Sequence, residues 1–168
     1  MKKLLLLIGI VFFTSLSAMA QEVSKVDAFI GYSYVRAPEE LNLNGFNASV
    51  TGNLNNYLSF VADFGGTYNS GESLTTFLFG PQVSLRTANS RVTPFARALF
   101  GAARTDIRRI PNEKTGFGTA IGGGLDIKLT DRISLRAIQG EYLLARFEGD
   151  NRSHTRISTG LVFHFGKK

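Results

Sequence analysis

The sequence contains no cysteine and no tryptophan among its 168 residues. Without cysteine, the chain can form neither disulfides nor metal sites built on thiolates. Beyond residue 20 it also lacks any apolar run close to the roughly 20 residues that a membrane-spanning helix requires. Its mean hydropathy of +0.03 is near neutral. Average hydropathy alone would therefore indicate a soluble exported protein.

The first twenty residues have the three parts of a secretory signal peptide. Lys2 and Lys3 supply the charged start, residues 4–13 are apolar, and Ala18-Met19-Ala20 offers an Ala-x-Ala cleavage site. A short buried N-terminal helix would explain the apolar run but neither of its flanks. We therefore expect cleavage after residue 20, which leaves residues 21–168 as one domain.

Hydrophobic residues in that domain recur with a period of two, which is typical of strands that have one apolar face. The pattern predicts eight strands, at residues 25–36, 46–54, 58–65, 75–86, 92–104, 116–129, 133–146 and 154–165. Most of them exceed the roughly 5–6 residues of ordinary strands and suit a tilted strand that crosses a hydrocarbon layer. The expected fold is an all-β, eight-stranded, antiparallel up-and-down transmembrane barrel.

The seventh predicted strand changes phase in its middle. Its apolar face starts on odd-numbered residues such as Ile133 and Leu135, and it continues on even-numbered ones such as Tyr142. One extra residue near Ala137-Ile138 would restore the alternation, and a β-bulge inserts one such residue. We predict a bulge at this point.

The predicted connections alternate in length. Those after the second, fourth and sixth strands are short, at Asn55-Asn56, 87–91 and Thr130-Asp131, and the others are mostly longer, at 37–43, 69–74, 105–115 and 148–153. Outer-membrane barrels combine short periplasmic turns with longer extracellular loops. An even number of strands places both termini on the periplasmic side.

The two faces of the strands differ in a way that favours lipid outside. Aromatic residues gather near strand ends on the apolar face: Tyr32, Tyr34, Phe46, Phe64, Phe77, Phe117, Tyr142, Phe163 and Phe165. Glycines crowd the other face: Gly31, Gly65, Gly80, Gly101, Gly118, Gly122, Gly124, Gly140 and Gly160. Aromatic girdles mark membrane barrels, and a narrow eight-stranded interior has little room for side chains. A soluble, lipocalin-like barrel would instead line a cavity with large apolar residues.

The last strand carries the most specific family resemblance. Residues 159–165, with Thr159 and Gly160 followed by Phe163 and Phe165, resemble the C-terminal signal by which eight-stranded outer-membrane β-barrels, typified by the OmpA transmembrane domain and OmpX, are recognised by the assembly machinery. The family usually ends on the aromatic residue, whereas Gly166-Lys167-Lys168 follows here. The resemblance implies an outer-membrane location and says much less about activity.

Charged residues on the interior face form the main candidate site. They are Asp63, Arg97, Asp126, Lys128, Arg136, Glu141 and Arg156. We expect the acids and bases to pair across the lumen as a structural plug. The alternative is a gated pore for ions or small solutes, in which rearranged pairs open a path.

The sequence offers little for catalysis or metal binding. His154 and His164 are ten residues apart on one predicted strand, about 33 Å at roughly 3.3 Å per residue, so they cannot share a metal. Ser153 and His154 point to opposite faces, which disfavours a triad with Asp150. Gly122-Gly123-Gly124 lies within a strand, where close packing at a bend explains it better than phosphate binding. We expect no enzymatic activity, cofactor or metal.

Basic residues gather at the predicted outer rim, at Arg104, Arg108, Arg109 and Lys114, with Arg146 and Arg152 nearby. Arginine binds phosphate in a bidentate way, so this rim is a candidate contact for lipopolysaccharide; solvated loop charges are the alternative. Nucleic-acid binding is not expected, because the charge is modest and divided between both ends.

The sequence thus predicts a small integral outer-membrane barrel with a structural, adhesion or surface-interaction role, in contact with membrane lipid and favoured as a monomer. The pore of the same fold is the first alternative. A soluble periplasmic ligand-binding barrel is the second.

Overall fold

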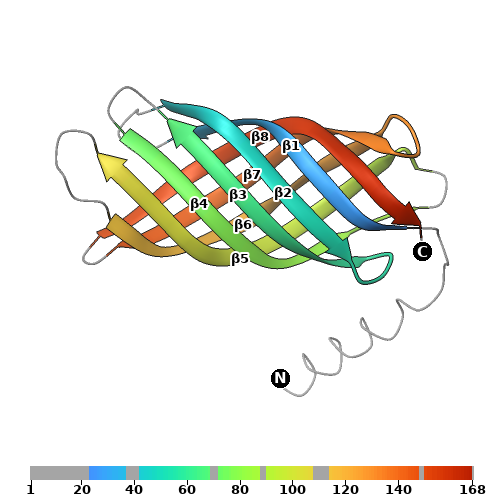
Figure 1. Ribbon diagram of the computed structural model, residues 1–168, viewed down its shortest axis with the longest axis horizontal. Helices are drawn as coiled ribbons and strands as arrows, with labels where there is room; N and C mark the ends of the chain where they lie inside the picture. The colour runs from blue at the N-terminus through green and yellow to red at the C-terminus, as the bar shows by residue number, and fades with distance from the viewer. Residues whose placement is uncertain are drawn as a thin grey trace, which may run out of the picture.

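A computed structural model describes residues 23–36, 42–68, 72–87, 90–107, 114–147 and 150–167. Its elements are eight strands: β1 (Ser24–Arg36), β2 (Asn42–Asn53), β3 (Leu58–Tyr68), β4 (Glu72–Ser84), β5 (Val92–Ile107), β6 (Lys114–Lys128), β7 (Ile133–Phe147) and β8 (Asp150–Lys167). Each strand pairs antiparallel with its sequence neighbour, and β1 pairs with β8, so the sheet closes into a barrel (Figure 1). This confirms the predicted fold class and number of strands.

The two ends of the barrel are distinguished by their connections. We call the end that carries the start of β1, the end of β8 and the turns 54–57, 85–91 and 129–132 the termini end. The opposite end, where β1 leads to β2, β3 to β4, β5 to β6 and β7 to β8, is the loop end. The predicted signal peptide lies outside the described residues. No helix long and apolar enough to cross a membrane occurs within the described ranges.

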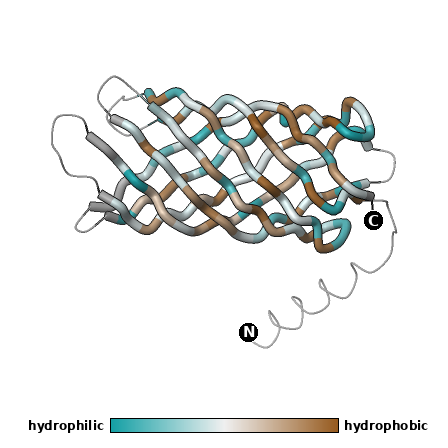
Figure 2. The backbone as a smooth tube through the Cα atoms, in the orientation of Figure 1, coloured by the Kyte–Doolittle hydropathy of each residue, from teal (hydrophilic) through white to brown (hydrophobic). Residues whose placement is uncertain are grey.

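The outer surface of the barrel is apolar. Side chains such as Ile30, Phe77 and Ile121 are 56–59% exposed, whereas lumen-facing neighbours such as Leu78 are fully buried. Brown and pale segments alternate along the strands in Figure 2. Outward rings also contact each other across strands, and the Phe79 and Phe100 centroids are 4.7 Å apart. An apolar face that points outward contradicts the soluble ligand-binding barrel, which would bury that face.

The predicted bulge in β7 is confirmed. Leu125 of β6 pairs with Ile138, and the next residue, Asp126, pairs with Arg136, so Ala137 is the extra residue. The pairing of β7 with β8 shifts between Arg136 and Gln139 in the same way. One correction follows from this shift: Gly140 lies on the outer face, opposite Ile157, and not on the lumen face.

Several strands extend beyond their predicted limits, and the connections at the loop end are correspondingly shorter. β2 begins at Asn42 instead of residue 46, and β8 begins at Asp150 instead of residue 154. Polar residues at these ends break the alternation, but they still join the ladder. Tyr34, for example, donates its hydroxyl hydrogen to Asn42 Oδ1 at 2.6 Å, and Asn42 pairs with Arg36.

Side chains stabilise the tight turns at the termini end. Asn55 Oδ1 accepts hydrogen bonds from the backbone N–H groups of Tyr57 (2.8 Å) and Leu58 (2.7 Å). Thr130 Oγ1 accepts from Arg132 and Ile133 in the same manner. Asparagine and threonine favour turns because they can bond to nearby backbone groups.

The C-terminal extension continues β8. Lys167 pairs with Ser24 of β1, so the extension adds to the ladder past Phe165. Gly166 has a φ of 67°, in the left-handed region that favours glycine. The extension therefore lengthens the seam between β1 and β8.

Candidate functional site in the barrel lumen

Four charged side chains meet in the middle of the lumen, and we call them the central cluster: Asp63, Arg97, Glu141 and Arg156. Arg97 contacts Asp63 at 2.8 Å and Glu141 at 2.6 Å. Arg156 contacts the same two acids at 2.8 and 2.6 Å. Each arginine thus bridges both carboxylates, and the cluster joins β3, β5, β7 and β8 across the interior.

Neutral groups complete the hydrogen bonding of the cluster. The Asn47 amide donates to Asp63 at 3.0 Å, and Gln139 Nε2 donates to Glu141 at 3.0 Å and to Asn47 Oδ1 at 3.2 Å. Gly65 provides the space, because a Cβ there would lie 2.7 Å from Arg156 Nη1. A glycine at this position is therefore required by the arginine.

Protein atoms surround the central cluster almost completely. The four side chains are 0–2% exposed. Burying charges is costly, and the loss of one partner of a buried pair typically costs about 3–5 kcal/mol, because the other charge is left uncompensated. Two acids against two arginines leave the cluster formally neutral. This arrangement is consistent with a fixed crosslink between strands.

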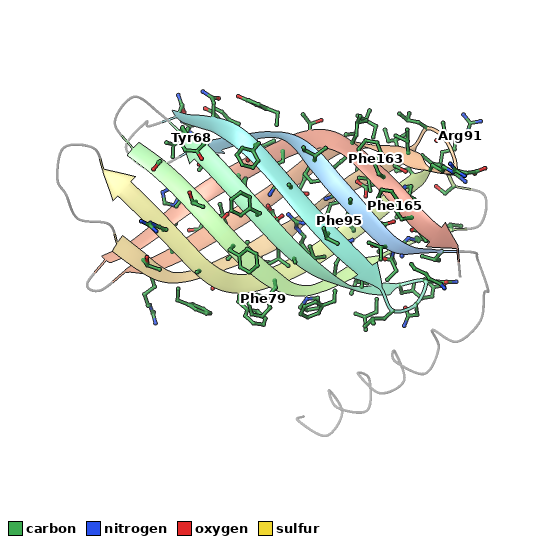
Figure 3. The ribbon with its side chains drawn as sticks, viewed as in Figure 1. Tyr68, Phe79, Arg91, Phe95, Phe163 and Phe165 are labelled. Atoms are coloured by element: carbon green, nitrogen blue, oxygen red, sulfur yellow. The ribbon has the colours of Figure 1, made fainter. Side chains whose placement is uncertain are left out.

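Arg136 closes the lumen on the termini side of the central cluster. Its guanidinium donates to Asp126 at 2.8 and 2.9 Å and to Gln139 at 2.7 Å. It also lies between two lumen-facing rings, 4.5 Å from the Phe29 centroid and 4.3 Å from that of Phe95. Cation–π contacts of this kind stabilise a desolvated arginine. Phe95 is labelled within the barrel in Figure 3, and Phe79 lies on its outer face.

The interior is less polar than the sequence predicted. Buried apolar side chains from β3 to β7 form one cluster, at Val61, Leu78, Leu99, Ala120 and Leu143. A second cluster, Val35, Leu43 and Leu74, lies near the loop end, where β1 ends and β2 and β4 begin. The lumen toward the loop end is therefore filled with apolar side chains.

A cavity of about 870 Å³ occupies the termini end. Its lining combines the charged side chains of Asp27, Arg86 and Arg132 with apolar ones such as Phe29 and Val162. Burial lowers the pKa of the Arg86 guanidinium from its ordinary value, and the charges of Asp27 and Asp126 act against that shift. The cavity reaches Arg136 and ends below the central cluster.

Asp27, His164 and Ser134 form a hydrogen-bonded chain in this cavity. His164 Nδ1 lies 2.7 Å from Asp27 Oδ1, and Nε2 lies 2.8 Å from Ser134 Oγ. The sequence analysis missed this chain, because its members come from β1, β7 and β8. The closing register supplies the signal: Asp27 is the direct partner of His164.

The other predicted site residues lie apart from the central cluster. Lys128 does not join it, because its Nζ contacts Asp131 at 2.7 Å and its side chain is 55% exposed. At the rim, Arg104 is exposed on β5 and the backbone of Lys114 pairs with Thr105. Arg108 and Arg109 lie outside the described residues. No group of three acids or histidines suited to a metal occurs in the described ranges.

The residues of the predicted assembly signal lie on β8. Thr159 Oγ1 donates to the carbonyl oxygen of Arg136 at 3.0 Å, and the Gly160 backbone packs against Ile30 of β1. Phe165 is 55% exposed on the outer face, and both phenylalanines are near the C-terminal end of the strand (Figure 3).

A closed antiparallel barrel with an apolar exterior and charges inside has the architecture of a transmembrane β-barrel. The sequence matches the family model of the outer membrane protein beta-barrel domain over residues 5–165. The chain therefore belongs to this family and is a transmembrane barrel of the outer membrane. Among curated proteins, no significant match is found.

Solved structures share this fold at low sequence identity. Neisserial surface protein A is 17% identical, with a TM-score of 0.65, over 83% of this chain and 96% of its own. The N-terminal barrel of Pseudomonas aeruginosa OprF is 15% identical, with a TM-score of 0.56, over 86% and 100%. Ail, the attachment invasion locus protein of Yersinia pestis, in complex with the heparin analogue sucrose octasulfate, is 18% identical, with a TM-score of 0.56, over 85% and 99%. None of these descriptions names an enzymatic reaction.

Proposed function

We propose that this protein is a non-conducting outer-membrane barrel that acts through its loop end, as a structural or surface-interaction protein. The observation that carries the proposal is the central cluster. Its four charged side chains cross the lumen, are 0–2% exposed and leave no unbalanced formal charge to attract ions. The apolar clusters beyond it add a second obstacle to a water-filled path.

Planar-bilayer recording of the purified barrel tests the closed lumen. We expect no single-channel events at any applied voltage, because opening would separate buried ion pairs. Reproducible stepwise conductance would favour the narrow pore instead. Arg156→Met provides a matched comparison, since it removes one bridging arginine and should raise leak conductance if the cluster is the barrier.

The proposed partner at the loop end is the phosphate of lipopolysaccharide, held by Arg104, Arg108, Arg109 and Lys114. Arg104 is exposed on β5, and β6 begins at Lys114 beside the end of β5. Arginine pairs with phosphate through two parallel hydrogen bonds. The Ail structure with a polysulfated sugar supports this assignment, because it shows a polyanion with a barrel of similar fold.

Lipopolysaccharide retention tests this rim. Arg108→Ala combined with Arg109→Ala should lower the amount of lipopolysaccharide that co-purifies with the barrel. Arg91→Ala combined with Arg132→Ala removes the same charge at the termini end and should leave retention unchanged. Equal retention by all three proteins would reject the rim as the contact.

We further infer that Thr159, Gly160, Phe163 and Phe165 present β8 to the outer-membrane assembly machinery. The outward exposure of Phe165 supports this role. Phe165→Ala should reduce the fraction of heat-modifiable, folded protein in cells without affecting the stability of barrels refolded in detergent by more than the lost contact.

A further inference from the structure

Three side chains at the termini end are hydrogen-bonded in the order that acyl transfer requires. Ser134 Oγ lies 2.8 Å from His164 Nε2, and His164 Nδ1 lies 2.7 Å from Asp27 Oδ1. Because a carboxylate only accepts, Nδ1 carries the hydrogen toward Asp27, and Nε2 is left to accept the hydroxyl hydrogen of Ser134. This arrangement of nucleophile, base and orienting acid recurs on unrelated folds and is recognised by geometry.

The sheet and its side chains hold the chain in place. The closing register sets Asp27 directly opposite His164, and the backbone N–H of His164 donates to the Arg132 carbonyl at 2.9 Å. Asn53 donates to the second carboxylate oxygen of Asp27 at 2.8 Å, and Ser24 donates to the first. A catalytic base needs this kind of support from neighbouring groups.

All three side chains line the cavity of about 870 Å³. The His164 side chain is 23% exposed, so its ring reaches the open space. Phe29, Ile133 and Val162 give the cavity an apolar wall. In another part of the lining, the buried Gln82 Oε1 has no hydrogen-bond partner among the described residues, which leaves an acceptor for a bound molecule.

Positive charge lies next to the serine. Lys128 is the direct cross-strand partner of Ser134, and both residues line the cavity together with Arg132. Cross-strand partners typically have Cβ atoms about 5 Å apart. A cation at this distance can stabilise the negative oxygen that develops when a serine attacks a carbonyl.

We propose that Ser134 and His164 are catalytic residues that hydrolyse small carboxylic esters in this cavity, with Asp27 as a positioning residue. Ser134 Oγ forms a bond to the carbonyl carbon while its proton passes to His164 Nε2. The ester C–O bond then breaks, and the departing alkoxide takes that proton. Water releases the acid from the serine by the same steps, with His164 accepting and returning one proton.

This proposal goes beyond the surface role proposed above and replaces the expectation that the protein has no enzymatic activity. A hydrogen-bonded chain that only stabilises the fold would have the same geometry but no enhanced nucleophile. The difference is therefore chemical reactivity at one named serine, which can be measured without knowing the natural substrate.

A fluorophosphonate probe measures that reactivity. The Ser134 oxygen would bond to phosphorus, fluoride would leave, and His164 would take the proton. The folded barrel in detergent should acquire one adduct, located by mass spectrometry on Ser134, and the heat-unfolded chain should acquire none. Because the adduct is located on the wild-type protein, the result does not depend on a variant folding.

Variants separate the roles of the three residues. Ser134→Ala should lose the adduct, and His164→Asn should slow labelling about 100-fold or more, the usual range for a lost general base. Asp27→Asn should also slow labelling, with partial rescue by Asp27→Glu. Ser84→Ala is the matched control, because Ser84 is a buried serine of the same cavity bonded only to Gln82, and it should label at the wild-type rate.

Folding of each variant is checked by heat-modifiable migration on gels. The proposal is overturned if the folded wild-type barrel forms no adduct at Ser134, or if the unfolded chain forms it at the same rate. Labelling together with hydrolysis of p-nitrophenyl butyrate that both disappear in Ser134→Ala would establish the activity.

Discussion

Two groups of ionisable side chains lie in the same lumen, and they differ in how completely the protein surrounds them. In the central cluster, each charge is 0–2% exposed and meets two partners of opposite sign. At the termini end, Asp27 and His164 line a cavity, and the His164 side chain is 23% exposed. The first group can only hold strands together, whereas the second can also meet a molecule from outside. The comparison separates a structural role from a chemical one.

The largest expected effect comes from deleting Ala137. Without the bulge residue, β7 must place either Arg136 or Glu141 on the lipid face, because a shift of one residue exchanges the two faces of a strand. We expect no folded, heat-modifiable barrel from this deletion. Ala137→Gly retains the length of the strand and should still fold. A deletion variant that folds normally would show that the bulge does not set the register.

Arg156→Met should produce the next largest effect. It leaves Asp63 and Glu141 with one arginine between them, so the free energy of unfolding should fall by about 3–5 kcal/mol. Urea unfolding followed by circular dichroism measures this change without a tryptophan signal. The exposed Arg132→Met is the control and should lie within about 0.5 kcal/mol of the wild type. Equal effects at both sites would remove the distinction between the buried cluster and the surface.

Removing both members of one pair sharpens the comparison. Asp63→Asn combined with Arg97→Met should cost less than the two single changes added together. The difference should be about 0.5–3 kcal/mol, as is found for directly contacting residues. Additive costs would show that these two side chains do not interact energetically.

The smallest expected effect belongs to Asp27→Asn. This carboxylate loses charged hydrogen bonds, but it lies beside a cavity that can admit water, so we expect a cost of about 1–2 kcal/mol in unfolding free energy. That value should stay clearly below the cost of Arg156→Met in the same urea series. A loss as large as that of Arg156→Met would place Asp27 in a structural role like that of the central cluster.

The fold could be predicted because each strand is long and half of its residues face lipid. Period two gave the number of strands, and the change of phase after Leu135 gave the bulge. The limits of β2 and β8 could not be predicted, since residues such as Asn42 are polar where strands leave the membrane. The sequence pattern contains no boundary at such points.

The site was only partly predictable. The lumen charges could be selected by their face, but their pairing depends on strand tilt and on barrel closure. Lys128 is on the correct face, yet it lies at the end of β6, where its long side chain reaches Asp131 instead. Asp27, Ser134 and His164 are far apart in sequence, and only the registers at β8 bring them together.

The most direct test of a lumen that is open at the termini end and sealed in the middle uses single cysteines, since the natural chain has none. Thr93→Cys lines the cavity, and Ser33→Cys replaces a serine that is 1% exposed and accepts a hydrogen bond from Ser158. Each variant is treated, as a folded barrel in lipid vesicles permeable to the reagent, with a charged thiol reagent. We predict rapid modification at position 93 and none at position 33. Equal rates at the two positions would contradict the account.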